Sequence, residues 1–99
     1  MSAPLLESSF VSLMPNQVSC DLAGEKAILH MESGVYYGLN PLGARIWEMI
    51  QTPKRVREIR DALLAEYAVD VDQCERDLFA LLSELAEARL IQVRNETAA

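Results

Sequence analysis

The sequence has few of the residues from which catalytic and metal sites are built. It holds a single histidine, His30, and two cysteines, Cys20 and Cys74, that lie far apart along the chain. It contains no Cys-x-x-Cys pair and none of the patterns GxSxG, HExxH, GxGxxG and GxxxxGK[ST]. We therefore expect a protein that is not an enzyme and that uses neither a cofactor nor a metal.

The lone histidine and the two cysteines are better explained as structural residues. His30 stands in an extended run of residues, where a solvent-facing or hydrogen-bonded histidine is more common than a general base. Cys20 and Cys74 are expected to be two buried thiols in a reducing compartment.

Long hydrophobic runs are also missing. Although 51% of the residues are hydrophobic, no uninterrupted run approaches the roughly 18 residues that a membrane span needs. The N-terminal segment lacks a basic start, and Glu7, Ser8 and Ser9 interrupt its apolar residues, so it does not resemble a signal peptide. These features predict a cytoplasmic protein without membrane contact, and its 99 residues fit a single domain.

Positive charge is scarce except in one segment. The formal net charge of −6 argues against nucleic acid as a partner. Four basic residues gather at the start of a predicted helix, where they oppose the helix dipole and are expected to face solvent or a partner. These residues are Lys54, Arg55, Arg57 and Arg60.

Alternation of apolar and polar residues predicts three strands. The first runs over residues 18–22, the second over residues 26–31 and the third over residues 35–39. Short turns containing Gly24 and Gly34 separate them, so we expect a three-stranded antiparallel meander whose first and third strands are its edges.

The segments outside this core are predicted from composition. Residues 1–17 carry two prolines and a short apolar group, and are expected to form an N-terminal arm that docks loosely on the domain. The domain itself is expected to span residues 18–94, ending with a short extended piece over residues 90–93. Residues 95–99 form a polar tail.

Helical signals begin directly after the third strand. Asn40 is a candidate N-cap and Pro41 suits the first helical position, while Thr52-Pro53 ends the segment. A second helix is predicted by the stripe of Val56, Ile59, Leu63 and Tyr67.

The third helix has the strongest signals. Asp70 and Gln73 form a capping-box pattern at its start. Its apolar arc covers about half the circumference, which is wider than a core-facing stripe usually needs. Either the helix packs on two sides, or part of the arc serves a partner. The arc consists of Cys74, Leu78, Leu81, Leu82 and Leu85, extended by Phe79 and Ala86.

Three strands followed by three helices predict an α+β domain of winged helix-turn-helix type. A regulator that binds nucleic acid is one alternative, although acidic residues outnumber basic ones on the third helix. An edge strand beside an apolar helix could instead accept an extended peptide as an added strand. A dimerisation module that uses the same edge on itself is a further alternative.

Two segments carry a resemblance to a known family: VYYGLNPLGARIWEMI and VREIRDALLAEYAVDVDQCERDLFALLSELAEARLIQV. Together with the predicted strands, they resemble the PqqD-like peptide chaperones over residues 18–93. The similarity is greatest to the stand-alone recognition elements of lasso-peptide biosynthesis. One departure is visible, because Ala88-Arg89 stands where the family commonly ends the third helix with glycine, so a less sharp helix end is expected.

The resemblance implies a non-catalytic adaptor that binds the leader segment of a ribosomally made precursor peptide. The leader would pair with the third strand and pack on the third helix. It would be presented to a separate leader peptidase, a cysteine protease, which removes it before a cyclase, a further possible partner, closes the ring. The basic residues 54–60 could dock the peptidase, and a monomer or weak homodimer is expected. The implied leader-binding residues are Val35, Tyr36, Tyr37, Gly38, Leu39, Cys74, Asp77, Leu78, Leu81 and Leu85.

Overall fold

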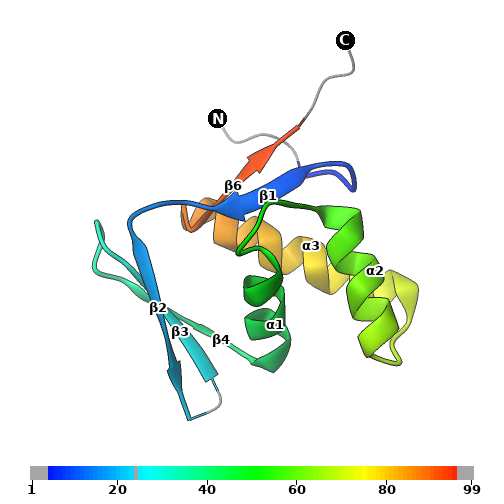
Figure 1. Ribbon diagram of the computed structural model, residues 1–99, viewed down its shortest axis with the longest axis horizontal. Coiled ribbons are helices and arrows are strands. Elements are labelled where there is room, and N and C mark those ends of the chain that lie inside the picture. The colour runs from blue at the N-terminus through cyan, green and yellow to red at the C-terminus, as the bar shows by residue number, and fades with distance from the viewer. Residues whose placement is uncertain (1–4, 24, 96–99) are drawn as a thin grey trace.

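The computed structural model of the protein describes residues 5–23 and 25–95. These residues form an α+β fold with two small antiparallel sheets and three helices (Figure 1). In chain order the elements are β1 (Phe10–Leu13), β2 (Gln17–Leu22), β3 (Glu25–His30), β4 (Tyr36–Leu39), α1 (Pro41–Met49), β5 (Lys54–Arg55), α2 (Val56–Glu66), α3 (Val71–Glu87) and β6 (Ile91–Arg94).

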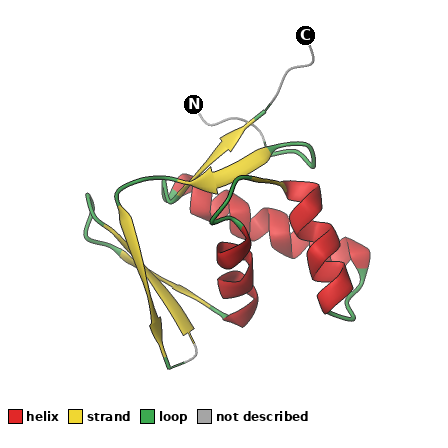
Figure 2. Cartoon of the chain, viewed as in Figure 1, coloured by secondary structure: helices red, strands yellow, loops and turns green. Residues whose placement is uncertain are grey.

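The predicted meander is confirmed as the sheet β2-β3-β4. Its three strands pair in register, so that Val18 lies opposite Leu29 and Leu29 lies opposite Tyr36. Figure 2 shows this sheet standing to one side of α1, and β4 leads into that helix after one residue. Asn40 is that residue, and its Oδ1 accepts a hydrogen bond from the Gly43 backbone N–H at 2.8 Å.

The prediction of a loosely docked arm is wrong for residues 10–13. They form β1, the central strand of a second sheet ordered β5-β1-β6, and Val11 is fully buried there. Val11 pairs with Val93 from the other end of the chain, which makes β6 the partner of the predicted arm. Of the predicted tail, only Asn95 lies within the described residues, and Ser9 Oγ donates a hydrogen bond to its side chain.

The start of α3 follows the predicted cap only in part. The Asp70 carboxylate accepts a hydrogen bond from the Gln73 backbone N–H at 3.2 Å, as an N-cap should. The Gln73 side chain does not return to Asp70, because its carbonyl oxygen accepts from the Arg76 guanidinium at 3.2 Å and its NH₂ group donates to Asp77 Oδ1 at 2.8 Å.

The end of α3 is sharp, which corrects the expectation drawn from the missing glycine. Arg89 adopts the left-handed conformation itself, with φ of 61°. The Leu90 N–H donates to the Leu85 carbonyl and the Arg89 N–H donates to the Ala86 carbonyl, each at 3.0 Å. These two bonds form a Schellman motif, and Leu85 and Leu90 are both buried beside it.

The core lies where the three helices meet the two sheets. Trp47 of α1, Ile59 of α2, Leu82 of α3 and Ile28 of β3 are almost completely buried in it. Burying such a side chain contributes about 1.5–3 kcal/mol, so this cluster is the main source of stability. In the part of the chain that the structure describes, no helix has the length and apolar character of a membrane span.

Candidate functional site

The open edge of β4 is the first component of a candidate site. β4 is the last strand of its sheet and pairs only with β3 among the described strands. An edge strand presents backbone N–H and C=O groups that another extended chain can bind. In this fold the open edge lies near α3, and residues of both elements line a hollow between them.

This hollow, of about 430 Å³, forms a groove between β4 and α3. The pleat of β4 turns Tyr37 and Leu39 toward the helices and places Tyr36 and Gly38 on the opposite side. The lining residues are Tyr37, Gly38 and Leu39 from β4, with Leu81, Glu84, Leu85, Glu87 and Ala88 from α3 and its end.

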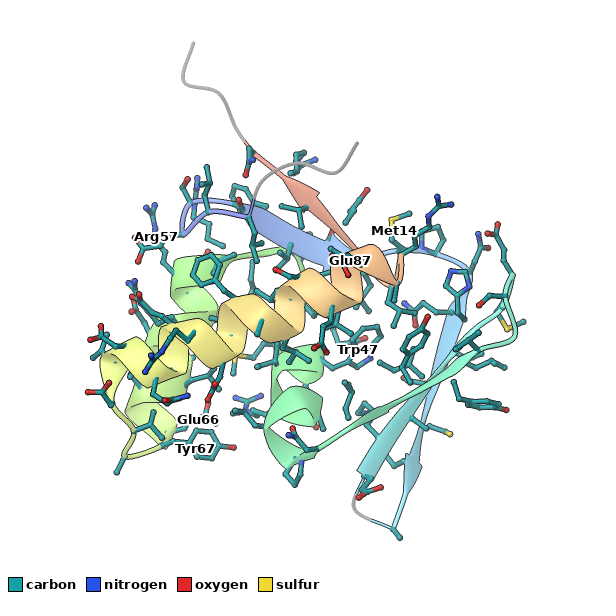
Figure 3. All side chains as sticks on the ribbon, turned by 180° about the vertical axis from the view of Figure 1, so that it is seen from behind. Met14, Trp47, Arg57, Glu66, Tyr67 and Glu87 are labelled. Atoms are coloured by element: carbon teal, nitrogen blue, oxygen red, sulfur yellow. The ribbon has the colours of Figure 1, made fainter. Side chains whose placement is uncertain are left out.

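The groove continues along α3 toward its N-terminus. A second hollow of about 380 Å³ shares Leu81 and Glu84 with the first and reaches the start of α1. A smaller apolar pocket of about 160 Å³ follows between the three helices, and Tyr67 is one of the residues that line it. Figure 3 shows the two ends of this path: Glu87 lies near the C-terminal end of α3, and Tyr67 lies beside the loop that precedes α3.

The groove has an apolar floor and an acidic wall. Leu39, Leu42 and Leu81 supply apolar surface, whereas Glu84 and Glu87 are exposed carboxylates on α3. No described basic side chain lines the groove or its apolar pocket. This arrangement suits an extended chain that carries apolar and basic side chains.

Most of the predicted binding residues are brought together along this path. Asp77 lines the second hollow, Cys74 and Leu78 line the apolar pocket, and the remaining helix positions line the first hollow. Several are largely buried and belong to the core as well as to the floor. These are Leu39, Cys74, Leu78 and Leu85, while Tyr37, Gly38, Asp77 and Leu81 keep exposed surface.

Two predicted residues line no part of the groove. Val35 precedes β4 and Tyr36 points to the other side of the sheet, where 66% of its surface is exposed. Sequence reasoning also missed Leu42, Glu84 and Glu87. Glu84 and Glu87 follow Leu81 at steps of three residues, so helical spacing would have placed them on the groove side of α3.

The basic segment over residues 54–60 is partly used within the molecule. The Arg55 guanidinium donates to the Ser8 carbonyl at 2.9 Å and lies 4.2 Å from the centre of the Phe10 ring. Arg60 forms ion pairs with Glu75 at 3.0 Å and with Glu7. Arg55 and Arg60 therefore hold the segment that precedes β1. The exposed Arg57 (Figure 3) contacts the same segment, because its backbone N–H donates to the Glu7 carbonyl at 3.0 Å.

The histidine and the two cysteines lie in different surroundings. His30 is buried and hydrogen-bonded, since its Nδ1 accepts from the Ser33 backbone N–H at 3.2 Å. The prediction of two buried thiols is wrong for Cys20, which is exposed. Its side chain lies on the side of the sheet that faces away from the helices. Burial raises the pKa of the Cys74 thiol, and nearby Asp77 and Glu75 raise that pKa further.

No metal-binding cluster accompanies the groove. Within residues 5–23 and 25–95, no three histidine, cysteine or acidic side chains are gathered closely enough to hold a metal ion.

Comparison with known proteins gives matches to structures and to one family. The structure resembles TbiB1 in complex with the TbiA(beta) leader peptide, with a TM-score of 0.74 and 38% identity over 89% of this chain and 99% of that chain. It also resembles a lasso peptide synthetase B1 complexed with the leader peptide, with a TM-score of 0.74 and 26% identity over 82% of this chain and 95% of the other. The comparison with curated proteins gives no significant match.

The family match covers the elements that build the groove. The model of the family of coenzyme PQQ synthesis protein D, PqqD, matches residues 25–91, which include β3, β4 and all three helices. The predicted resemblance is confirmed, and the chain belongs to the PqqD family as a PqqD-like recognition element.

Proposed function

We propose that the protein is a non-catalytic adaptor that binds the leader segment of a ribosomally synthesised precursor, as in lasso-peptide biosynthesis. The observation that carries the proposal is the open edge of β4 beside a groove along α3. Two proteins of similar structure form complexes with leader peptides, and this supports the same use of the groove here.

The leader would bind by strand addition to β4. Each new backbone hydrogen bond contributes about 0.5–1.5 kcal/mol, whereas ordering each leader residue costs about 1–2 kcal/mol. The hydrogen bonds therefore set the register but supply little net affinity. Affinity would come from leader side chains that contact Tyr37 and Leu81 or enter the apolar pocket, each contributing about 1.5–3 kcal/mol when fully buried.

The acidic wall adds a preference for the charge of the leader. Glu84 and Glu87 lie on the α3 side of the groove, so a leader with lysine or arginine near these positions would bind more tightly. Because the carboxylates are exposed, salt should weaken this part of the affinity.

In this proposal the adaptor presents the leader to a separate leader peptidase and performs no chemical step. One strand edge and one helix face hold the leader, and the rest of the precursor remains outside the groove. The peptidase supplies the nucleophile and cleaves the leader, after which a cyclase closes the ring of the product.

The test is titration of the labelled protein with the leader peptide encoded beside its gene, followed by backbone amide spectra. We expect shifts in β4 and along the groove side of α3, and none with a scrambled peptide of the same composition. If the amides of β4 and α3 stay unchanged while others move, the proposed groove is wrong.

A further inference from the structure

A buried histidine holds the turn that leads into β4. His30 is the last residue of β3 and is only 8% exposed, although the turn that follows it is open to solvent. Its Nδ1 accepts a hydrogen bond from the Ser33 backbone N–H, and the Ser33 hydroxyl lies 3.1 Å from the same nitrogen. The Ser33 Oγ also accepts a hydrogen bond from the Val35 N–H at 3.3 Å. These side-chain hydrogen bonds connect the end of β3 with the residue that precedes β4.

The backbone hydrogen bonds of the same turn determine which way the groups of β4 point. The His30 N–H donates to the Val35 carbonyl at 3.0 Å, so these residues face each other as a hydrogen-bonded pair at the closed end of the hairpin. Gly34, with φ of 70°, donates its N–H to the His30 carbonyl at 2.8 Å. Hydrogen-bonded and non-hydrogen-bonded pairs alternate along an antiparallel ladder. The backbone groups of Tyr36, the next residue, therefore point to the open edge and away from β3.

The two ends of β4 are held in different ways. At the C-terminal end, Leu39 is buried in the core and Asn40 caps α1. At the N-terminal end, Val35 and Tyr36 are both exposed, so side-chain packing holds this end only weakly. The hydrogen bonds of the turn are what keeps this end in place. Without them the edge would have to be ordered when the leader binds, and ordering on binding lowers affinity.

We propose that His30 and Ser33 are positioning residues for leader binding. Their hydrogen bonds hold the start of β4 as a strand, with the backbone groups of Tyr36 directed outward, before the leader arrives. Neither side chain contacts the leader, because His30 is buried and Ser33 lies in the turn ahead of the edge. This inference rests on the proposed leader binding.

The positioning role depends on a hydrogen-bond acceptor at Nδ1. An imidazole that accepts at Nδ1 carries its proton on Nε2 and is neutral. Asparagine has its side-chain oxygen on the Cγ atom, where histidine has Nδ1, so H30N keeps an acceptor for Ser33. Phenylalanine has a ring of similar size without an acceptor, so H30F removes these hydrogen bonds. Because Ser33 is exposed, water can replace them, and the domain should still fold.

The test is calorimetric titration of the variants with the leader peptide encoded beside the gene. We expect H30F to bind the leader at least fivefold more weakly than the wild type, and H30N to bind it within twofold of the wild type. S33A keeps the backbone N–H and loses the hydroxyl, so it should bind about threefold more weakly. The matched control D21N removes an ion pair with Lys26 from the other hairpin of the same sheet, and it should bind like the wild type.

Amide hydrogen exchange in the free protein gives a measurement that a general loss of stability would not reproduce. The Tyr37 amide lies in the ladder opposite Ile28, and it should exchange at least fivefold faster in H30F than in the wild type. The amides of α3 and β6 should keep their rates. Saturation with leader should restore slow exchange at Tyr37, because the bound leader orders the strand. A fivefold loss of affinity corresponds to an edge that is ordered in about one fifth of the molecules.

Wild-type affinity in H30F would overturn the proposal. Equal losses in H30F and H30N would also overturn it, since the acceptor would then have no part in the effect, and so would an equal loss in D21N. If H30F does not fold, wild-type affinity and wild-type Tyr37 exchange in S33A would overturn the proposal in the same way. A wild type that fails to bind the leader would instead overturn the proposed function.

Discussion

Arg89 shows how one residue ends a helix at a cost. Its φ of 61° lies in the left-handed region, which costs a residue with a Cβ about 1–2 kcal/mol relative to glycine. The Schellman hydrogen bonds and the burial of Leu90 against the end of α3 hold it there. Arginine at this position therefore lowers stability relative to glycine, although the turn that ends α3 is kept.

We predict that R89G stabilises the protein by about 0.5–1 kcal/mol. Relief of the left-handed strain exceeds the extra freedom that glycine gives the unfolded chain, about 0.4–1 kcal/mol. Thermal unfolding should show a rise of a few degrees, at roughly 4–8 °C per kcal/mol for a chain of this size. The control A88G alters a residue with φ of −76° and should lower stability. A decrease in R89G would show that the arginine side chain has a stabilising role.

The two thiols should differ strongly in reactivity. Cys20 is exposed, whereas Cys74 is buried and the pKa of its thiol is raised by that burial. Since the thiolate is the reactive form, we expect one rapidly modified cysteine with Ellman's reagent in the native protein. The second should react only as the protein unfolds, and two equally fast thiols would contradict the burial of Cys74.

At the scale of the element, α3 serves two surfaces at once. Leu82 is completely buried in the core, while its neighbour Leu81 is half-buried and lines the groove. The wide apolar arc in the sequence therefore includes both core residues and residues that line the groove. The same element carries the acidic wall through Glu84 and Glu87, so its position decides both the stability of the domain and the chemistry of the groove.

Substitutions at these neighbouring positions should separate the two surfaces. L81E should change the free energy of unfolding by less than about 1 kcal/mol, and weaken leader binding at least tenfold, or about 1.4 kcal/mol. L82A should lower stability by about 2–5 kcal/mol through a core cavity and leave the affinity of the folded fraction unchanged. Urea unfolding and calorimetric titration would measure both, and collapse of L81E would assign Leu81 to the core.

On the scale of the whole molecule, the first and last of the described strands, β1 and β6, lie in one sheet. Val11 of β1 pairs with Val93 of β6. Both strands contribute side chains to the hydrophobic core, Val11 from β1 and Ile91 from β6. The N-terminal segment is further held by Arg55 and Arg60. The domain is therefore closed by contacts between its first and last strands.

We predict that V11A lowers the free energy of unfolding by about 2 kcal/mol, because it removes buried methyl groups from the central strand of this sheet. The control S12A changes a partly exposed position on the same strand and should have a much smaller effect. Removing residues 1–13 should destabilise the protein further, which denaturant unfolding would measure. A shortened chain with unchanged stability would restore the interpretation of these residues as a loose arm.

Local patterns were sufficient wherever the structure depends on neighbours in the sequence. Two-residue alternation identified β2, β3 and β4, and helical periodicity with the caps Asn40 and Asp70 identified the three helices. The order of these elements, together with the two segments quoted above, was enough to predict the family and to predict that the strand of the candidate site is an edge strand. Hydrogen bonds between near neighbours determine these features, so they can be read directly from the chain.

Features that depend on distant residues required the folded structure. Pairing of β1 with β6 joins segments that are far apart in the sequence, and the pattern of a four-residue strand does not reveal such a partner. The face that each β4 side chain occupies depends on the register with β3, which turned Tyr37 toward the groove and Tyr36 away from it. Whether an apolar residue lies in the core, in the groove or on the exposed surface depends on what packs against it, and periodicity carries no information about that neighbour.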